Sequence, residues 1–293
     1  MAGCTAGPVT VISDAASSPS AEAPAHHPRS TRASAASLRS LSREFGAAYA
    51  LMAVARKLAA WLPDQLDDQM LAIEGRRGVL GPAHRRWAQH SVARNREVWS
   101  HWEWSRGGEE WTASPEWKQT LIDDVLVSVV PAGGTVLEIG PGAGRWTAAL
   151  HELAERLILV DITDTTLELC RELLGDPENV TYVRTDGAGL RDIATASLDA
   201  VWSFDAFVHI APLDVAAYLK EVGRTLRPGG VALIHHTGRR DRLGWRSPMT
   251  AGLFASLARE GGLTVERQFD RWAGGRFGVD RQGDVLTRLR RPM

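Results

Sequence analysis

The sequence predicts an α/β fold: a doubly wound, mostly parallel sheet with an antiparallel last strand, preceded by an N-terminal helical cap. Between about residue 114 and residue 290, short apolar runs alternate with segments of helical spacing. Near-continuous apolar strands separated by helices are typical of a parallel sheet covered on both faces. The two final apolar runs, 263–269 and 284–290, have no helix between them. The last strand is therefore expected to pair antiparallel, because a parallel connection needs a long crossover.

Five further apolar runs complete a seven-stranded sheet, and helices separate them. The expected strands are 135–139, 157–160, 180–183, 200–204 and 231–235. The expected helices are about 145–154, 165–174, 213–226 and 248–259. An earlier helix begins at Ser114 and Pro115, because serine caps a first turn and proline suits the first helical position. Pro131 ends that helix.

The first third of the chain has a different character. Residues 1–37 contain ten Ala, seven Ser and four Pro, too little apolar surface to offset the entropy of ordering, so they are expected to be disordered. Leu41, Phe45, Tyr49 and Met52 recur at helical spacing and predict a helix that Pro63 ends; a second is expected at about 64–74. The expected domains are a disordered tail (1–37), a helical cap or lid (38–112) and the α/β domain (113–293).

The composition is that of an ordinary globular protein. The net charge of −1 gives no field that would favour nucleic acid or a membrane. The two cysteines, Cys4 and Cys170, lie far apart, which argues against disulfides and a cysteine zinc site and favours a reducing compartment. No run approaches the roughly 18 apolar residues that span a bilayer, and no signal-peptide core is present. A cytoplasmic protein without a metal site is expected.

A glycine-rich turn after the first expected strand is the sharpest signal. Gly140, Gly142 and Gly144 follow residues 135–139 and open a helix. Glycines allow a tight turn and let a ligand approach the backbone. Seventeen residues after Gly144, the second strand ends at Asp161, where a carboxylate can accept hydrogen bonds from both ribose hydroxyls of a nucleoside-containing cofactor.

The spacing argues against a dinucleotide cofactor. The G-x-G-x-x-G fingerprint needs a small residue at position 145, where this chain has Arg145. Glu138 lies two residues before the first glycine. Its negative charge disfavours a pyrophosphate but suits a cofactor with an ammonium and a sulfonium group. The loop therefore fits S-adenosylmethionine better than NAD.

These residues resemble motif I of the class I S-adenosylmethionine-dependent methyltransferases, and the likeness extends in order through about residues 114–290. The resemblance implies a Rossmann-like fold and S-adenosylmethionine as cofactor. It also implies roles for residues after the first four strands. The residues implied in cofactor binding are Glu138, Gly140, Gly142, Gly144, Asp161, Ile162, Asp186, Gly187 and Ser203.

Histidines after strands four and five are the candidate catalytic groups. His209 follows Asp205 in an arrangement that resembles small-molecule members of the superfamily. A histidine of ordinary pKa suits removal of a hydroxyl proton, so His209 is the expected general base and Asp205 positions His209 or the substrate. The alternative is that His209 only packs or caps a helix. His235 and His236 point to opposite faces of a strand, so at most one reaches the substrate; His236 is the third candidate.

Two segments are candidates for binding the acceptor. Six of eleven tryptophans fall within residues 87–117; they are expected either to form a lid over the pocket, with Trp104 and Arg106 facing the acceptor, or to join the N-terminal helices to the sheet domain. The loop 236–248 carries four arginines. Arg246 is expected to grip a carboxylate, a phosphate or a polyhydroxylated ring, unless the loop is simply solvated surface.

The sequence thus predicts methyl transfer to a small molecule, with O-methylation of a hydroxyl on a sugar or specialised metabolite as first choice. N- or C-methylation, or a non-catalytic cofactor-binding partner subunit, are the alternatives. Adenine-N6 methyltransferases have an acid or amide, two prolines and an aromatic residue after the fourth strand. This chain has Asp205-Ala-Phe at that position. Neither cysteine lies where cytosine-C5 enzymes have their nucleophile. Nucleic acid and membrane partners are therefore not expected, and the chain is expected to be a monomer or homodimer.

Overall fold

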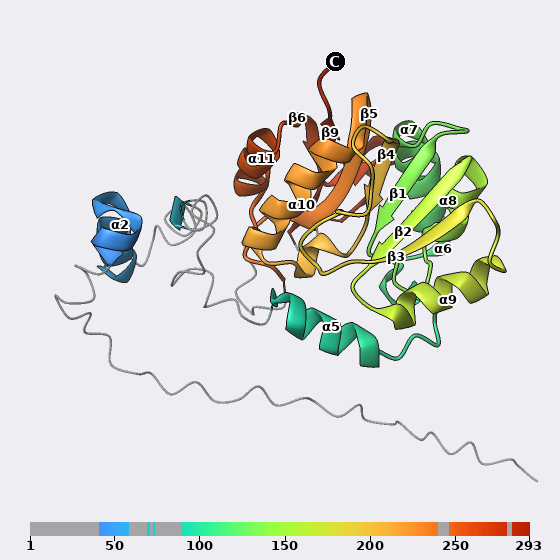
Figure 1. Ribbon diagram of the computed structural model, residues 1–293, viewed down its shortest axis with the longest axis horizontal. Coiled ribbons are helices and arrows are strands. Elements are labelled where there is room, and N and C mark those ends of the chain that lie inside the picture. The colour runs from blue at the N-terminus through green and yellow to red at the C-terminus, as the bar shows by residue number, and fades with distance from the viewer. Residues whose placement is uncertain (1–40, 59–68, 71–72, 74–89, 240–245, 280–282) are drawn as a thin grey trace, which may run out of the picture.

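The computed structural model describes residues 41–58, 69–70, 73, 90–239, 246–279 and 283–293 (Figure 1). The tail predicted at 1–37 and nearly all of the helix predicted at 64–74 lie outside the described residues. So does part of the arginine-rich loop, although Arg246 itself is described.

The sheet has seven strands in the order β3-β2-β1-β4-β5-β9-β6. Strands β1 to β5 pair in parallel, whereas β9 is antiparallel to both β5 and β6. The predicted fold class, including the antiparallel last strand, is confirmed. The strands are β1 (Thr135–Ile139), β2 (Arg156–Asp161), β3 (Val180–Arg184), β4 (Leu198–Ser203), β5 (Leu226–Thr237), β6 (Thr264–Phe269) and β9 (Asp284–Arg290).

Helices cover both faces of this sheet, so the fold is doubly wound (Figure 1). On one face α10 (Pro212–Thr225) and α11 (Ala251–Glu260) pack through residues such as Leu219 and Phe254. On the other, α8 (Thr147–Leu153), α9 (Asp164–Leu174) and the helix after Ser114 pack through residues such as Leu121 and Leu150. Successive residues of a buried strand point to opposite faces of the sheet, so alternate residues pack into the apolar clusters on the two faces.

The helix after Ser114 begins as predicted but is not uniform. The Ser114 hydroxyl accepts a hydrogen bond from the Trp117 backbone N–H at 3.0 Å, and Pro115 occupies the first helical position. Segment α6 (Pro115–Leu121) passes into a π-helical turn, η3 (Ile122–Leu126), and then into α7 (Val127–Val129). Regular apolar spacing cannot distinguish such a turn from continuous α-helix.

The N-terminal part contributes α2 (Ala47–Leu58), α5 (Val92–His101) and the short turn η2 (Glu109–Trp111). Phe45 and Tyr49 are buried with stacked rings 4.7 Å apart and belong to the apolar cluster of the α10 face. The sequence did not predict α5, which lies beneath the sheet next to α9 (Figure 1). None of the helices in the described ranges is long and apolar enough to cross a membrane.

A small hairpin near the C-terminus was also not predicted. Strands β7 (Arg271–Trp272) and β8 (Phe277–Gly278) pair antiparallel around the turn η5 (Ala273–Gly275). The Trp272 indole N–H donates to the Thr120 hydroxyl at 3.1 Å, and the Trp117 indole N–H donates to the Gly278 carbonyl at 3.1 Å. These two hydrogen bonds fasten the hairpin to α6.

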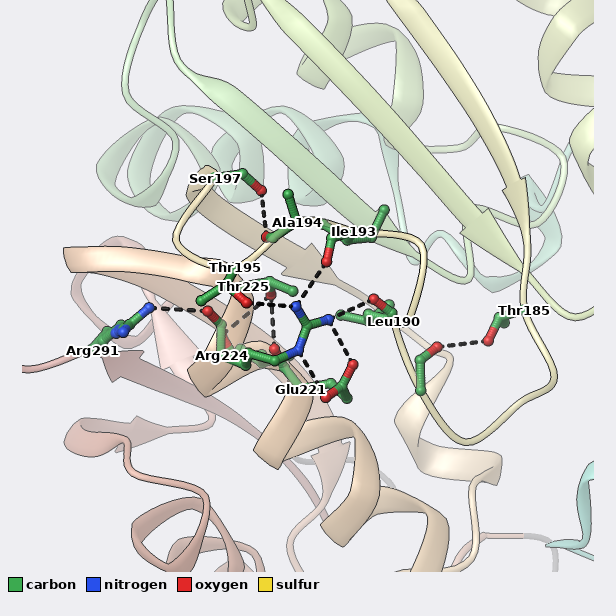
Figure 2. A network of polar contacts seen from close by, with 12 residues as sticks. Thr185, Leu190, Ile193, Ala194, Thr195, Ser197, Glu221, Arg224, Thr225 and Arg291 are labelled. Carbon is green, nitrogen blue, oxygen red and sulfur yellow. Dashed lines mark hydrogen bonds and ion pairs between the residues drawn. The ribbon is translucent and has the colours of Figure 1, made fainter.

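Arg224 of α10 fixes the loop between β3 and β4 (Figure 2). Its guanidinium donates to the Ile193 carbonyl at 2.9 Å and the Leu190 carbonyl at 2.8 Å, and it pairs with Glu221. The Thr185 hydroxyl donates to the Gly189 carbonyl at 2.7 Å at the start of this loop. Irregular backbone of this kind needs such side-chain partners, and the bonds hold the segment that carries Gly187.

Candidate functional site

A cavity of about 1020 Å³ lies where the parallel strands end. This volume is at the upper limit of the roughly 300–1000 Å³ typical of small-molecule sites. One end is lined by the loops after β1, β2 and β3. The other end is lined by the turn after β4, the end of β5, the start of β9 and the hairpin β7–β8. The N-terminal segment around α5 contributes a further wall.

The glycine loop forms the floor at the first end. Gly140 has φ of 70°, and a Cβ placed there would lie 2.5 Å from the Cβ of Ala206. Gly142 has φ of 58°. The ring of Trp104 packs against it, and a Cβ at this position would lie 3.1 Å from that ring. Both glycines are therefore required by backbone conformation and by close approach. Gly144, also in the left-handed region, packs against Leu173 and, contrary to the prediction that it binds the cofactor, is not part of the cavity wall.

Glu138 lies behind this floor, outside the cavity wall. It is 1% exposed, and its Oε2 accepts a hydrogen bond from the Thr147 hydroxyl at 2.7 Å. Burial raises the pKa of Glu138 to about 7. The carboxyl therefore ties the end of β1 to the start of α8 and sets the path of the glycine loop between them.

Asp161 and Ile162, at the end of β2, do line the cavity. Asp161 is buried, and its Oδ1 accepts the Thr163 backbone N–H at 3.0 Å. Burial raises the pKa of Asp161 to about 6. The Ile162 carbonyl accepts from Arg96 Nε at 3.2 Å, so α5 is fastened to this edge of the site.

Gly187 also lines the cavity and lies against the side chain of Val92 of α5. Two other residues predicted to contact the cofactor lie elsewhere. Asp186 is half-exposed, pairs with Arg191 at 3.3 Å and is not part of the wall. Ser203 is buried and donates to the Ile139 carbonyl at 2.7 Å, so it joins β4 to β1 rather than facing the cavity.

The clustered tryptophans have different surroundings; Trp87 lies outside the described residues, and Trp102 is exposed and outside the cavity wall. Trp99, Trp104 and Trp111 line the cavity, and Trp99 contacts His209 with ring centroids 5.2 Å apart. Trp117 also lines the cavity but belongs to the apolar core, with Trp272 at 5.4 Å. Arg106 is exposed and outside the wall.

The second end of the cavity is strongly polar. Asp205, directly after β4, forms an ion pair with Arg145 and lies 3.1 Å from His235 Nδ1. Its φ of 62° is in the left-handed region, which Asp tolerates better than most residues. Burial opposes ionisation, but His235 and Arg145 outweigh it and hold the pKa of Asp205 well below its ordinary value. Asp205 is therefore a carboxylate at neutral pH.

The three histidines differ sharply. Burial lowers the pKa of His235, but the carboxylates of Asp205 and Asp284 outweigh this and raise it. Burial and the nearby Arg246 lower the pKa of His209, another cavity residue, to about 4, so its ring is neutral above about pH 5.

His236 lies away from the cavity. Its ring stacks on Phe254 with centroids 3.6 Å apart, and its Nε2 lies 2.7 Å from the Thr287 hydroxyl. Because neighbouring strand residues face opposite sides, His235 occupies the cavity wall instead, and we do not retain His236 as a catalytic candidate.

A model of the methyltransferase domain family matches residues 137–234, which run from β1 through β5. The matched region holds the glycine loop, Asp161, Asp205 and His209, and the seven-stranded sheet has the predicted antiparallel last strand. The chain contains a class I S-adenosylmethionine-dependent methyltransferase domain. Its cofactor is S-adenosylmethionine.

Curated relatives of this methyltransferase domain are similar over part of their length. A dimethylglycine N-methyltransferase of Parasynechococcus marenigrum is 34% identical over 122 residues, 41% of this chain and 42% of the relative. Phosphoethanolamine N-methyltransferase 1 of Triticum aestivum is 29% identical over 38% of this chain and 23% of its own. The chain thus spans less than half the length of these relatives.

A solved structure supports the fold of the methyltransferase domain. In a complex of the Haloferax volcanii Trm112 methyltransferase activator with a methyltransferase, the matching chain is 22% identical and superposes with a TM-score of 0.53. The match covers 69% of this chain and 98% of that chain. At this identity the likeness concerns the fold alone.

The first end of the cavity in this methyltransferase domain fits S-adenosylmethionine. Gly140 and Gly142 line the cavity without side chains of their own, and Asp161 offers a buried carboxylate at the neighbouring strand end. Backbone and carboxylate of this kind suit a nucleoside with a charged amino-acid tail. Gly140, Gly142, Asp161, Ile162 and Gly187 line this end and are the residues that would hold the cofactor.

The sequence did not single out Asp284 or the hairpin β7–β8. Asp284 is the first residue of β9, and because β9 is antiparallel its first residue lies at the edge where the parallel strands end. That position is the signal that could have found it. The hairpin's Phe277 also lines the cavity, but two short strands leave too little periodicity to detect.

Proposed function

We propose that the protein transfers a methyl group from S-adenosylmethionine to a small-molecule acceptor held at the second end of the cavity. The observation that carries this proposal is that one cavity joins the glycine loop and Asp161 to a wall of buried titratable side chains, Asp205, His209 and His235. The bound cofactor supplies an electrophilic methyl group. The protein aligns the acceptor's nucleophile with it, which is the main task in an in-line displacement.

We propose O-methylation of a hydroxyl, on a sugar or specialised metabolite, as the first reaction to test. His209 is the candidate base because its ring is neutral and can accept a hydroxyl proton. With its pKa lowered to about 4, it is a weaker base than the histidine of ordinary pKa that the sequence predicted. The Asn95 side chain donates to the His209 carbonyl at 2.8 Å, so α5 helps to position this residue. Asp205, held ionised by Arg145 and His235, orients the acceptor.

N-methylation is the second candidate, and two observations favour it. The relatives above are named as N-methyltransferases of dimethylglycine and phosphoethanolamine. In addition, tryptophan rings and carboxylates line the same cavity, and both attract a cationic nitrogen.

We also propose that residues 38–112 act as a cap, of which the part from α5 to η2 is a lid. Trp99 and Trp104 of this part line the cavity, and Arg96 and Asn95 bond to backbone carbonyls of two cavity loops. Trp117, in contrast, packs in the apolar core between α6 and the sheet. The alternative to a lid is that the other rings only join the N-terminal helices to the sheet domain.

The test is a screen of hydroxyl and amine acceptors with the full chain and S-adenosylmethionine, in which release of S-adenosylhomocysteine is measured. His209→Asn is expected to lower kcat for a hydroxyl acceptor about 10²-fold or more, with unchanged affinity for S-adenosylhomocysteine. His151→Asn, remote from the cavity, is the control. Cofactor binding without turnover of any acceptor would support a binding subunit instead. No binding of S-adenosylhomocysteine would contradict the cofactor site.

A further inference from the structure

Five charged or titratable side chains form a continuous chain along the second end of the cavity. His235 lies in the middle, with Nδ1 3.1 Å from Asp205 Oδ1 and Nε2 3.5 Å from Asp284 Oδ2. An arginine pairs with each carboxylate: Arg145 with Asp205, and Arg246 with Asp284, the latter at 3.1 Å. All five residues line the cavity. We call this set the charge chain.

Three members of the charge chain have buried polar atoms without a hydrogen-bond partner among the described residues. One is His235 Nε2, which lies 3.5 Å from Asp284 Oδ2. The other two are Arg145 Nη1, which has no acceptor, and Asp284 Oδ1, which has no donor. Their side chains are only 5% and 3% exposed. Buried polar groups in proteins are almost always paired, and an unpaired charged group is the costliest exception. The Arg145 guanidinium therefore lacks one hydrogen-bond acceptor and the Asp284 carboxylate lacks one donor, and both residues line the same cavity.

Aromatic rings hold the Arg145 and His235 side chains in place. The Arg145 guanidinium lies over the ring of Trp146, 4.9 Å from its centroid, and 5.5 Å from that of Phe204. The His235 ring stacks on Phe204 with centroids 4.4 Å apart, on the strand that pairs with β9. Aromatic faces hold cations and rings in place. The Arg145 and His235 side chains are thus held in fixed positions, as a binding site requires.

The charge chain lies on the acceptor's side of the cavity. Asp205, His235 and Asp284 come from the ends of β4, β5 and β9, whereas the cofactor loops follow β1, β2 and β3. In the sheet order these two sets of strands occupy opposite halves. Only Arg145, which follows the glycine loop, reaches from one half to the other.

We propose that the charge chain recognises the acceptor, and that the acceptor is an amino acid or a hydroxy acid. Such a molecule presents a hydrogen-bond donor, an ammonium or a hydroxyl, to Asp284 and a carboxylate oxygen to Arg145. Charge-assisted hydrogen bonds of this kind are stronger than neutral ones. This inference rests on the proposed function for its assignment of acceptor and cofactor ends. It adds a substrate class that the methyltransferase fold does not specify.

The experiment uses the full chain saturated with S-adenosylhomocysteine and measures ligand binding by calorimetry, without turnover. The probes are glycine, N,N-dimethylglycine and glycolate, which carry a donor and a carboxylate. They are compared with ethanolamine, which lacks the carboxylate, and acetate, which lacks the donor. The three acids with a donor are expected to bind at least tenfold more tightly than either truncated probe. Equal or weaker binding of these acids would overturn the inference.

Variants assign the two contacts. Asp284→Asn and Arg145→Lys are expected to weaken binding of the acids tenfold or more and to change the affinity for S-adenosylhomocysteine less than twofold. Arg276→Gln is the matched control, because Arg276 lines the cavity mouth but is exposed and paired with Glu116. Thermal melts verify folding, and Arg145→Gln is a second variant if Arg145→Lys does not fold.

The other outcomes are equally decisive. Selective loss of S-adenosylhomocysteine binding in these variants would assign the charge chain to the amino-acid part of the cofactor and overturn the inference. The proposed function fails separately: acids that bind as expected but are never methylated would contradict methyl transfer to them while leaving the recognition site in place.

Discussion

Trp104 lies directly on Gly142, where a Cβ would lie 3.1 Å from two ring carbons of the indole. The Trp104 indole N–H donates to the Trp99 carbonyl at 3.2 Å, so the ring is held over the glycine loop by its own segment. Gly108 of the same segment lies against the Cβ of Arg145. The N-terminal segment therefore covers the glycine loop at the first end of the cavity.

We expect Trp104→Ala to weaken binding of S-adenosylhomocysteine about tenfold, equivalent to ~1.4 kcal/mol, because the variant removes the apolar cover of the glycine loop. The measurement is a calorimetric titration with a thermal melt to verify folding. Trp102→Ala is the control, since Trp102 is 40% exposed and outside the cavity wall. Equal affinities of the two variants would show that Trp104 packs the segment without serving the ligand.

Asp161→Asn is expected to weaken S-adenosylhomocysteine binding by about tenfold or more, since an amide is a poorer acceptor for two ribose hydroxyls than a carboxylate. Asp164→Asn, on the exposed first turn of α9, is the control. The pKa of Asp161 is raised to about 6, so wild-type affinity is expected to fall as the pH drops below 6, and that of Asp161→Asn is not. A pH-independent wild-type affinity would contradict the role of the ionised carboxylate.

Sequence patterns predicted what is local or repetitive and missed what depends on distant segments. The limits of β1 and β9 and the cap at Ser114 follow from spacing and residue type, and all were predicted to within a few residues. His236 rather than His235 was named from the sequence as a catalytic candidate, whereas His235 lines the cavity; the choice depends on which face of β5 turns toward the cavity. Asp284 was missed because its neighbours, His235 and Arg246, lie far away along the chain.

We expect His236→Gln to destabilise the protein without affecting catalysis. The variant removes the stacking on Phe254 and disturbs the contact with Thr287 in a fully buried position. Such losses typically cost about 1–3 kcal/mol of unfolding free energy. Urea unfolding measures the loss, and kcat at a temperature where the variant is folded is expected to be unchanged. A large fall in kcat with unaltered stability would return His236 to the list of catalytic candidates.

Glu138 is expected to make stability depend on pH in an unusual direction. Its pKa is about 7 in the folded protein against an ordinary value of 4.5, because burial disfavours the carboxylate. Below pH 4.5 both folded and unfolded chains are protonated there and nothing is lost. Between pH 4.5 and 7 the folded protein retains a proton that the unfolded chain has released, so stability falls as pH rises. The full loss, on the order of 3 kcal/mol, is present above pH 7.

The glutamine variant isolates this effect. The glutamine of Glu138→Gln can still accept a hydrogen bond from the Thr147 hydroxyl but has no proton to lose. The unfolding free energy of the variant relative to that of the wild type is therefore expected to increase as the pH rises from 5 to 8. Urea unfolding at several pH values measures the difference, with Glu152→Gln on the exposed side of α8 as the control. A constant difference between Glu138→Gln and wild type across this range would show that Glu138 is ionised in the folded protein throughout. The charge behind the glycine loop would then be permanent, and it would stabilise the cofactor's cationic groups at every pH at which the protein is folded.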